Sequence, residues 1–462
     1  MSDPSRFDPG SVDTFRIVDR RFDVASRTAH LRYAFDDRYA FEETITFVTP
    51  PAPDEKADTA GLERALLHLH IAAGTSYYKA AAPDDVHLEG VGLQPAEAEF
   101  HRHLYDDGLR EFAVTNGLPV PRPVTIRAGF ADTLPVVPLA ADRSTPGGAR
   151  SRTGGLAVPI GGGKDSMVLI EAVRHLQPRL FAVNPHPLVV ELARQTGLEL
   201  IVVRRQLAPE LAELNRAGGL NGHVPITAIV SLIAVVGSFI YGYDTIAMAV
   251  ERSASEETVL VDGVPVNHQY SKSLEFEHLL QRLIAGSIDP GLTYGSALRP
   301  YSELAIARAF AGLTEYHATF CSCNAAFRQQ AGVDERWCGH CPKCRFVGLM
   351  LAPFLSPAAL SAIIGRNMFD DPEQIEGFAA LMSAVEKPFE CVGERRESAV
   401  AMQQLSESRR WARAPVVAAL ADVARTMVAH ADAEALLTAD LTLAFPDPTV
   451  AIAVERLIGG SA

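Results

Sequence analysis

The sequence predicts an α/β protein built on a doubly wound parallel sheet. From Leu156 onward, short apolar runs typical of buried strands alternate with segments of helical periodicity. A glycine-rich turn joins the first of these strands to the first helix, and the chain beyond Cys344 has a mostly helical pattern. Such alternation places helices on both faces of a parallel sheet, and ligands then bind at the carboxyl ends of its strands.

The residues before this region predict an α+β segment. Residues 13–48 alternate apolar and polar positions, which predicts antiparallel strands, and residues 62–73 predict a helix that ends in the loop GTSYYK. A stretch rich in proline, glycine and serine predicts a linker or flap. The expected organisation is an N-terminal α+β domain with a candidate role in substrate binding at 1–130, the linker or flap at 131–155, a nucleotide-binding domain at 156–320, a cysteine-rich knuckle at 321–352 and a helical region at 353–462.

The alternating region predicts its elements in order. It begins with the strand LAVPI at 156–160, followed by a helix from Ser166. Further strands are expected at 180–185, 198–203 and 244–250. Between them we expect a helix from about Pro187 and another over the apolar run at 226–241. That run is shorter than the ~20 residues that a spanning helix needs, so it predicts a buried core helix.

The charge of the chain limits its partners. A formal net charge of −14 over 462 residues is acidic, whereas nonspecific binding to nucleic acid or anionic membranes requires clustered Lys and Arg. We therefore expect no nucleic-acid partner and no membrane insertion. The segment MSDPSRFDPGSVDTF has neither the basic start nor the apolar core of a signal peptide, which predicts a cytoplasmic protein.

Three consecutive glycines open the segment GGGKDS at 161–166. A strand, a glycine turn and a helix start together offer backbone N–H groups and a positive helix end to an anion, usually a phosphate. A Walker A loop would need glycine at Val158 and Ser or Thr at Asp165, and a dinucleotide fingerprint would need glycine at Ser166. A plain strand-to-helix turn with an Asp or Ser cap is the structural alternative.

The same segment resembles the Ser-Gly-Gly-x-Asp-Ser loop of the PP-loop ATP pyrophosphatases, whose fold is of the adenine nucleotide alpha hydrolase type. The resemblance implies ATP and Mg²⁺, with the phosphates bound by Gly161, Gly162, Gly163 and Lys164. It further implies that Asp165 faces Mg²⁺ or braces the loop, and that Ser166 contacts phosphate. Gly161 stands where the superfamily usually has Ser, so this chain lacks one hydroxyl donor.

Five of the six cysteines lie in the segment CSCNAAFRQQAGVDERWCGHCPKC, 321–344. In a chain expected to be cytoplasmic, two C-x-x-C steps that share Cys341 indicate a metal more often than a disulfide. Four thiolates suit a closed tetrahedral Zn²⁺ site, which is structural because no position is left for water. The expected ligands are Cys338, Cys341, Cys344 and, in preference to Cys321, Cys323. An iron–sulfur cluster is the alternative.

Six motifs together cover nearly the whole chain: GTSYYK, IGGGKDS, ERSASE, NHQYSKS, CSCN with CGHCPKC, and KPFECVGE. Their combination resembles the family of bacterial UDP-N-acetylmuramoyl-L-alanyl-L-glutamate epimerases, which serve peptidoglycan precursor synthesis. The resemblance implies an ATP-dependent inversion of the terminal L-Glu of a nucleotide-sugar dipeptide to D-Glu. The cysteine-rich tail also resembles 7-cyano-7-deazaguanine synthase, so another PP-loop ligase that adenylates a carboxylate is the alternative.

Candidate site residues follow from strand ends and from these motifs. Glu251, Arg252 and Ser253 come after the strand at 244–250, where substrate is expected; a solvated turn is the alternative. We assign Glu251 a catalytic role and Arg252 and Ser253 to substrate binding. In NHQYSKS, Lys272 is expected to contact a phosphate in catalysis and His268 to bind substrate; a loop without function is the alternative.

Two further motifs carry assignments of a different kind. Cys391 in KPFECVGE is a candidate for exchanging the α-proton, provided that its pKa is lowered, whereas a buried inert thiol is the alternative. In GTSYYK, Tyr77 and Tyr78 are candidates for stacking on uracil and Lys79 for contacting the diphosphate. A pair of core aromatic residues is the alternative there.

The implied chemistry explains the need for ATP. The α-hydrogen of a terminal glutamate is hard to remove because the neighbouring carboxylate is already negative, and adenylation removes that charge. The preceding amide could also close to an easily racemised oxazolone, and hydrolysis would release the product with AMP and pyrophosphate. A nucleotide-binding zinc protein without enzymatic activity is the remaining alternative.

Overall fold

We analysed a computed structural model of the chain, which describes residues 7–51, 59–129, 154–327, 336–383, 387–428 and 432–460. The chain divides into two compact units that interleave along the sequence. Unit 1 comprises Met1–Gly155, Ile201–Ile246 and Val261–Thr293, and unit 2 comprises Leu156–Leu200, Ala247–Leu260 and Tyr294–Ala462. Most of the predicted linker at 131–155 lies outside the described residues, and the five-segment division stays a prediction.

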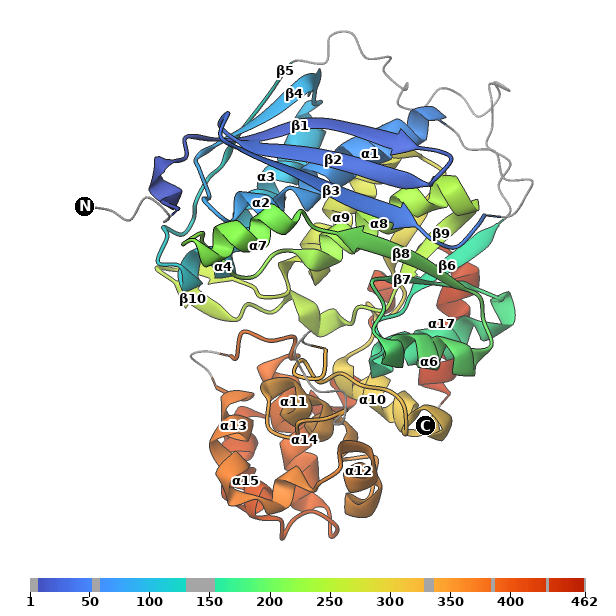
Figure 1. Ribbon diagram of the computed structural model, residues 1–462. Coiled ribbons are helices and arrows are strands. Elements are labelled where there is room, and N and C mark those ends of the chain that lie inside the picture. Colours follow the sequence, from blue (N-terminus) through green and yellow to red (C-terminus); the bar gives the residue numbers. More distant parts are fainter. Residues whose placement is uncertain are drawn as a thin grey trace. The chain divides into compact units, whose positions relative to one another are not determined.

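The fold class is α/β, as predicted, and Figure 1 shows the strands and helices of both units. In unit 1 the strands follow the order β8-β3-β2-β1-β4-β5. Their bounds are β1 (Thr14–Asp23), β2 (Thr28–Phe35), β3 (Tyr39–Phe47), β4 (Asp85–Gly92), β5 (Thr125–Gly129) and β8 (Leu200–Gln206). The pairs β1–β2 and β2–β3 are antiparallel, which confirms the prediction for residues 13–48, and β1–β4 and β4–β5 are parallel.

The strand predicted at 198–203 departs from a purely parallel arrangement. It forms β8, which pairs antiparallel with β3, with Thr46 opposite Arg204. Its apolar run is compatible with a parallel or an antiparallel pairing. The reason is that burial determines which residues of a strand are apolar, whereas the neighbouring strand determines the direction of pairing.

The helices of unit 1 are α1 (Thr59–Ala73), α2 (Thr75–Tyr78), α3 (Pro95–Asp106), α4 (Arg110–Thr115), α7 (Pro209–Arg216), α8 (Ile226–Tyr241) and α9 (Leu274–Leu283). The apolar run at 226–241 is the helix α8, as predicted, and it packs against α1. A helix that is apolar on all sides must be buried, and Gly242 ends it in a left-handed conformation with φ +74°. Among the described residues, no helix is long and apolar enough to cross a membrane.

The strands β12 (Thr293–Ser296), β9 (Tyr243–Met248), β6 (Gly155–Pro159) and β7 (Arg179–Val183) follow in that order, with β6 and β7 parallel. Most of β12 and β6 and all of β7 belong to unit 2, whereas β9 is divided between the units after Ile246. The short strands β10 (Val259–Val261) and β11 (Val264–Val266) form a separate pair, of which β11 belongs to unit 1. The helices of unit 2 are α5 (Lys164–Val173), α6 (Pro187–Thr196), α10 (Glu303–Ala311), α11 (Pro342–Leu351), α12 (Pro357–Ile364), α13 (Ile375–Ala380), α14 (Arg395–Glu407), α15 (Pro415–Met427), α16 (Asp432–Leu437) and α17 (Pro448–Gly459). The helical pattern predicted beyond Cys344 is thus confirmed in the described part of the chain.

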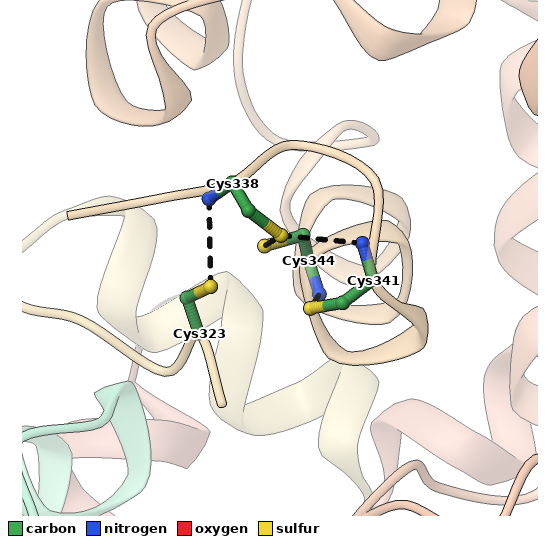
Figure 2. A group of neighbouring side chains, drawn as sticks. All are labelled: Cys323, Cys338, Cys341 and Cys344. Carbon is green, nitrogen blue, oxygen red and sulfur yellow. Dashed lines mark hydrogen bonds between the residues drawn. The ribbon is translucent and has the colours of Figure 1, made fainter. Parts of the chain in front are cut away.

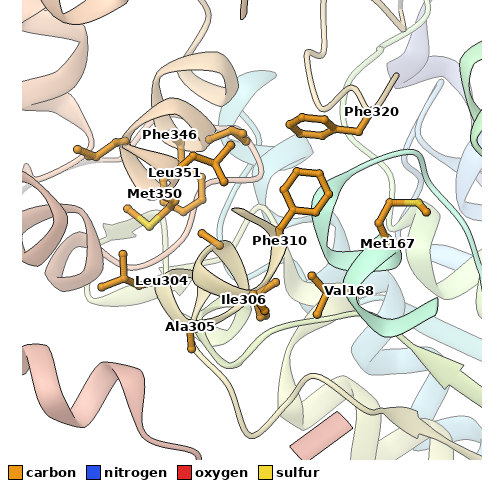
Figure 3. Packing of buried hydrophobic residues seen from close by; sticks show 14 of the residues in the cluster. Met167, Val168, Leu304, Ala305, Ile306, Phe310, Phe320, Phe346, Met350 and Leu351 are labelled. Carbon is orange, nitrogen blue, oxygen red and sulfur yellow. The ribbon is translucent and has the colours of Figure 1, made fainter. Parts of the chain in front are cut away.

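The core of unit 2 joins the helices α5, α10 and α11, of which α5 starts at the glycine loop and α11 in the cysteine segment. Figure 3 shows Met167 and Val168 of α5 near Ile306 and Phe310 of α10, with α11 on the other side of α10. All four of these side chains are buried. Because close-packed side chains leave little freedom, this core fixes where the glycine loop, the start of α10 and the cysteine segment lie within the unit.

Candidate active site

The glycine loop lies between the end of β6 and the start of α5. Gly162 has φ +87°, and a Cβ there would lie 3.1 Å from Cγ2 of Val189. A Cβ on Gly163 would lie 2.8 Å from the hydroxyl of Ser322. A Cβ on Gly161 would meet no described heavy atom within 4 Å. Backbone conformation therefore demands glycine at 162, a Cβ at 163 would require the hydroxyl of Ser322 to move, and a Cβ at 161 would have open space beside the loop.

The loop is held by two hydrogen bonds within unit 2. The backbone N–H of Cys321 donates to the carbonyl oxygen of Gly162 at 3.0 Å. The hydroxyl of Ser166 donates to the carbonyl oxygen of Gly163 at 2.9 Å. A phosphate contact of Ser166 stays a prediction, and it would require this hydroxyl to turn away from the loop.

Lys164, the first residue of α5, is buried and contacts the carboxylates of Asp165 and Glu303. Burial alone would lower the pKa of Lys164, but the two carboxylates outweigh it and raise that pKa. The side chain is therefore a charged partner of these acids. Its predicted role at the ATP phosphates stays a prediction.

Three carboxylates gather beside the loop. One oxygen each of Asp165, Glu251 and Glu303 lies within 4.8 Å of the others. Burial raises the pKa of Glu303 to about 7, against the opposing effect of Lys164. Carboxylate oxygens in this arrangement can hold a divalent cation such as Mg²⁺. Sequence reasoning found Asp165 and Glu251 but missed Glu303, whose place at the start of α10 after the strand β12 was the available signal.

The motif KPFECVGE lies against the same carboxylates. Glu397, at the start of α14, is buried, and its Oε1 accepts a hydrogen bond of 3.0 Å from the backbone N–H of Glu303. A Cβ on Gly393 would lie 2.8 Å from Oε2 of Glu397 and 3.1 Å from Cγ of Glu303. Burial, reinforced by neighbouring carboxylates, raises the pKa of Glu397 well above its ordinary value. Glu397 is a second residue that sequence reasoning missed.

The motifs ERSASE and KPFECVGE meet at Glu256. Its Oε2 accepts a hydrogen bond of 2.6 Å from Nζ of Lys387, and its Oε1 lies 3.1 Å from Nη1 of Arg395. The short helix at Arg252–Ser255 buries Ser253, and the N–H of Arg252 donates to Tyr301. The structure thus brings residues 251–256 and 387–395 together in unit 2, far apart as they are in the sequence.

Cys391 is half-buried, and its carbonyl oxygen accepts a hydrogen bond from Nζ of Lys343. Its segment reaches the buried carboxylates through Gly393. The proposed role of its thiol in proton exchange stays a prediction.

The remaining candidates lie in unit 1. Tyr77 and Tyr78 are buried; Tyr77 stacks on Tyr33 with ring centroids 4.6 Å apart, and Tyr78 contacts the ring of Tyr105. This packing corresponds to the alternative interpretation of the motif, in which the two tyrosines are core aromatic residues. Stacking on uracil stays a prediction, and it would require a ring to leave these contacts. Lys79 instead points to the loop after α7, where its Nζ donates to Oδ1 of Asn221 at 2.5 Å.

His268 and Lys272 belong to the same unit. Nδ1 of His268 lies 2.5 Å from Oε2 of Glu111, and Lys272 ends a short helix at Tyr270–Lys272. Their assigned roles in substrate binding and at a phosphate stay predictions.

Four cysteines of unit 2 form one group, shown in Figure 2. The group consists of Cys323, Cys338, Cys341 and Cys344, whose sulfur atoms lie within 4.8 Å of one another. The N–H groups of Cys341 and Cys344 each donate to the sulfur three residues earlier, at 3.4 Å. Cys321 is not part of the group, because its thiol donates to the carbonyl oxygen of Arg336 at 2.8 Å.

The group fits a zinc ion. Zn–S bonds of about 2.3 Å in a tetrahedron place the sulfur atoms about 3.8 Å apart, and the sulfurs of Cys338 and Cys344 are 3.7 Å apart. The backbone N–H groups that point at sulfur also stabilise thiolate charge. The four thiols can therefore bind zinc.

Comparison with known proteins agrees with the motifs. Residues 6–297 match the family model "MurL N-terminal domain", and residues 319–435 match "MurL C-terminal domain". Three curated proteins are each called UDP-N-acetyl-alpha-D-muramoyl-L-alanyl-L-glutamate epimerase. The protein of Salinispora tropica is 40% identical over 89% of both chains. That of Xanthomonas oryzae pv. oryzae is 39% identical over 89% of this chain and 90% of its own.

The third relative, from a Micromonospora species, is 40% identical over 89% of this chain and 91% of its own. No solved structure matches the chain significantly. Identity at this level over nearly the full length of several relatives, together with two family models in sequence, establishes the family. The chain belongs to the MurL family of epimerases, and it is an enzyme of the isomerase class.

Proposed function

We propose that the protein inverts the terminal L-Glu of UDP-N-acetylmuramoyl-L-alanyl-L-glutamate to D-Glu at the expense of ATP, which is cleaved to AMP and pyrophosphate. The substrate is the one in the names of the three relatives. The observation that carries the ATP dependence is the glycine loop at the start of α5 with three carboxylates gathered beside it. This pairing suits a nucleotide triphosphate with its divalent cation.

The reaction has three steps. One oxygen of the α-carboxylate attacks the α-phosphorus of ATP, and pyrophosphate leaves. The acyl-adenylate no longer carries the carboxylate charge, so the α-proton is removed from one face and a proton is added to the other, either directly or through an oxazolone. On the direct route, water then hydrolyses the acyl-adenylate and releases the D-Glu product and AMP. On the oxazolone route, ring closure has already released AMP, and water opens the ring to the D-Glu product.

The residues of unit 2 supply the environment for the first step. The N-terminus of α5 and the N–H groups of the loop favour the negative phosphates. Asp165, Glu251 and Glu303 would hold Mg²⁺, which offsets the charge that develops on the leaving pyrophosphate. Lys164 holds two of these carboxylates in place through its buried ion pairs. From this assignment we infer that unit 2 has a fold of the PP-loop type.

For the second step we assign proton exchange to Cys391. The support is the position of its motif, which contacts Glu303 and Glu397 through Gly393. The Cys391→Ala variant tests this assignment separately, because loss of deuterium exchange with retained AMP release would support it. Normal turnover by that variant would remove Cys391 from the mechanism.

We further propose that Zn²⁺ in the four-cysteine group is structural. Four protein ligands leave no position for substrate or water. Nearby contacts tie the group to the loop, because Cys321 bonds to Gly162 and Ser322 lies against Gly163. The metal would therefore help to keep the glycine loop in shape.

The decisive experiment incubates the purified protein with the dipeptide nucleotide, ATP and Mg²⁺ in D₂O. We expect D-Glu with deuterium at its α-carbon, together with AMP and pyrophosphate. Free L-Glu is expected to be a poor substrate, because it lacks the preceding amide and the nucleotide-sugar whose binding energy positions the reacting end. ADP as the product would overturn the adenylation step. AMP with an L-Glu that becomes amidated would favour the alternative, a carboxylate-adenylating ligase.

A further inference from the structure

Three side chains with metal-ligating atoms converge in unit 1. Glu111, His223 and His268 each offer one atom within 4.8 Å of the other two. Nδ1 of His268 lies 2.5 Å from Oε2 of Glu111, and Nδ1 of His223 lies 3.8 Å from the same oxygen. The two imidazole rings have centroids 4.5 Å apart. Both ring nitrogens thus face one carboxylate oxygen.

The segments that carry these residues are tied to α4, the helix of Glu111. Nη1 of Arg110 donates to the carbonyl oxygen of Pro265 at 3.0 Å, which holds the segment before His268. On the other side, Nδ2 of Asn116 donates to the carbonyl oxygen of Asn221 at 3.0 Å, which holds the loop of His223. The segments that carry the three side chains are therefore held by hydrogen bonds from side chains to backbone carbonyl oxygens, and these bonds do not involve the cluster itself.

The donor set is that of a transition-metal site. Two imidazoles and one carboxylate are a known set for Zn²⁺ with an open fourth position. In such a site, bonds of about 2.0–2.1 Å place the ligand atoms about 3.3 Å apart, and the two nitrogen–oxygen separations in the structure, 2.5 and 3.8 Å, lie on either side of this value. We propose that Glu111, His223 and His268 bind Zn²⁺ or a similar divalent transition metal, at a site separate from the four-cysteine group.

The exposure of the cluster agrees with this proposal. The side chains of His223 and His268 remain 21% and 14% exposed, so a cation can enter from solvent.

A neighbouring cluster in unit 1 is a weaker candidate. It consists of His103, Asp107 and Glu275. Asp107 is already paired with the guanidinium of Arg110, and Glu275 is exposed. One imidazole with a paired and an exposed carboxylate is a poor set for Zn²⁺. This cluster therefore supplies the matched control.

The surrounding charge predicts what fills the open position. Lys79 and Lys272 both bring a positive charge near His223. Their charges oppose a bare cation, so an anionic oxygen is the expected fourth ligand. Phosphate oxygens have this chemistry, and the diphosphate of the substrate would supply them; this last step rests on the proposed function.

The test is a Co²⁺ titration of the full chain after mild chelation, which empties a His/Glu site and leaves thiolate-bound metal in place. With excess Mg²⁺ present to occupy the three carboxylates of unit 2, we expect one equivalent of Co²⁺ to bind with visible bands but without the strong near-ultraviolet band of a cobalt–thiolate bond. The variants Glu111→Gln and His223→Gln should each weaken this binding at least tenfold, whereas His103→Gln should not change it. Addition of inorganic phosphate should shift the visible bands.

Several results would overturn the proposal. Absence of this additional equivalent in the wild-type chain, or wild-type affinity in both variants, would exclude the site. Loss of binding in His103→Gln would place the metal in the other cluster and would equally reject it. Near-ultraviolet circular dichroism checks that each variant is folded; His223→Gln, on a partly exposed loop, carries the test if Glu111→Gln does not fold.

An unchanged spectrum with phosphate would reject the anionic fourth ligand alone. None of these readouts requires epimerase activity, so the metal site and the proposed reaction can fail independently.

Discussion

The four-cysteine group of unit 2 and the cluster of Glu111, His223 and His268 in unit 1 are both sets of metal-ligating side chains, but they are distributed differently along the chain. Three of the cysteines follow one another at intervals of three residues, so a single turn and the start of α11 bring them together. The other set comes from three segments that meet through long-range packing. The comparison teaches that a site is visible in a sequence when its geometry is local.

The same difference separates two parts of the candidate active site. The glycine loop is contiguous, and its motif is recognisable without a structure. Glu303 and Glu397 join it from α10 and α14. Their separation from the loop along the chain gives no indication that they lie beside it. Four substitutions test this difference between contiguous and dispersed sites. They are given in order of decreasing expected effect at neutral pH.

The largest effect is expected for Cys341→Ser, which removes one ligand of the contiguous group. The free energy of unfolding should fall by ~5 kcal/mol or more, because structural zinc contributes about 10–16 kcal/mol in small zinc-binding peptides. Metal content and chemical denaturation measure this. Cys321→Ser is the matched control, since the thiol of Cys321 bonds to Arg336 outside the group. Full zinc content in Cys341→Ser, or its loss in the control, would contradict the assignment.

The next largest effect is expected for Lys164→Met, which breaks a contact between distant segments. It leaves the buried carboxylate of Glu303 without its cationic partner, and loss of one member of a buried pair costs about 3–5 kcal/mol. Denaturant unfolding measures the loss. The control Lys79→Met removes bonds to neutral oxygens and should cost less. Equal losses in the two variants would show that Lys164 does not act through the buried pair.

A smaller effect is expected for Gly162→Ala within the contiguous loop. Alanine at φ +87°, with its Cβ 3.1 Å from Val189, should cost about 1–3 kcal/mol of stability. Gly161→Ala is the neighbouring control, because a Cβ there meets open space among the described residues. Thermal unfolding compares the two. The explanation of the loop by backbone conformation fails if both variants are equally stable.

The effect that is smallest at neutral pH, and that grows only on acidification, concerns the buried His70 of unit 1. Burial lowers the pKa of His70 to about 3, below the value of about 6.5 in an unfolded chain. The unfolded state therefore binds the proton more tightly, and stability should fall as the pH drops from about 6.5 toward 3, by up to about 1.4 kcal/mol per pH unit.

His70→Leu should flatten this dependence in denaturation curves recorded across that pH range, with the exposed His175→Leu as the matched variant in unit 2. A slope unchanged by His70→Leu would assign the acid sensitivity to other groups.

Regular patterns made most of the elements predictable. The run at 226–241 coincides with α8, and the strands expected at 156–160 and 180–185 correspond to β6 and β7 within about a residue or two. The choice of Cys323 over Cys321 also agrees with the group in the structure. In each case the decisive property, periodicity or ligand spacing, involves residues close in the chain.

Properties that depend on residues distant in the chain could not be predicted from the sequence. The direction of β8 depends on its pairing with β3. The burial of Tyr77 and Tyr78 depends on rings contributed by other elements. The motif KPFECVGE lies beside Glu303 because Gly393 leaves room for the close approach.

The fold class, the glycine loop, the grouping of the four cysteines and the family could all be predicted from the sequence, because each is encoded in local periodicity, fixed spacing or a run of recognisable motifs. Only the folded chain shows that Lys164 pairs with Glu303 and that Glu397 accepts a hydrogen bond from the backbone of Glu303. The same holds for the convergence of Glu111, His223 and His268. The physical reason is that burial and electrostatic pairing arise between residues that long-range packing brings together, and their separation along the chain carries no sign of that contact.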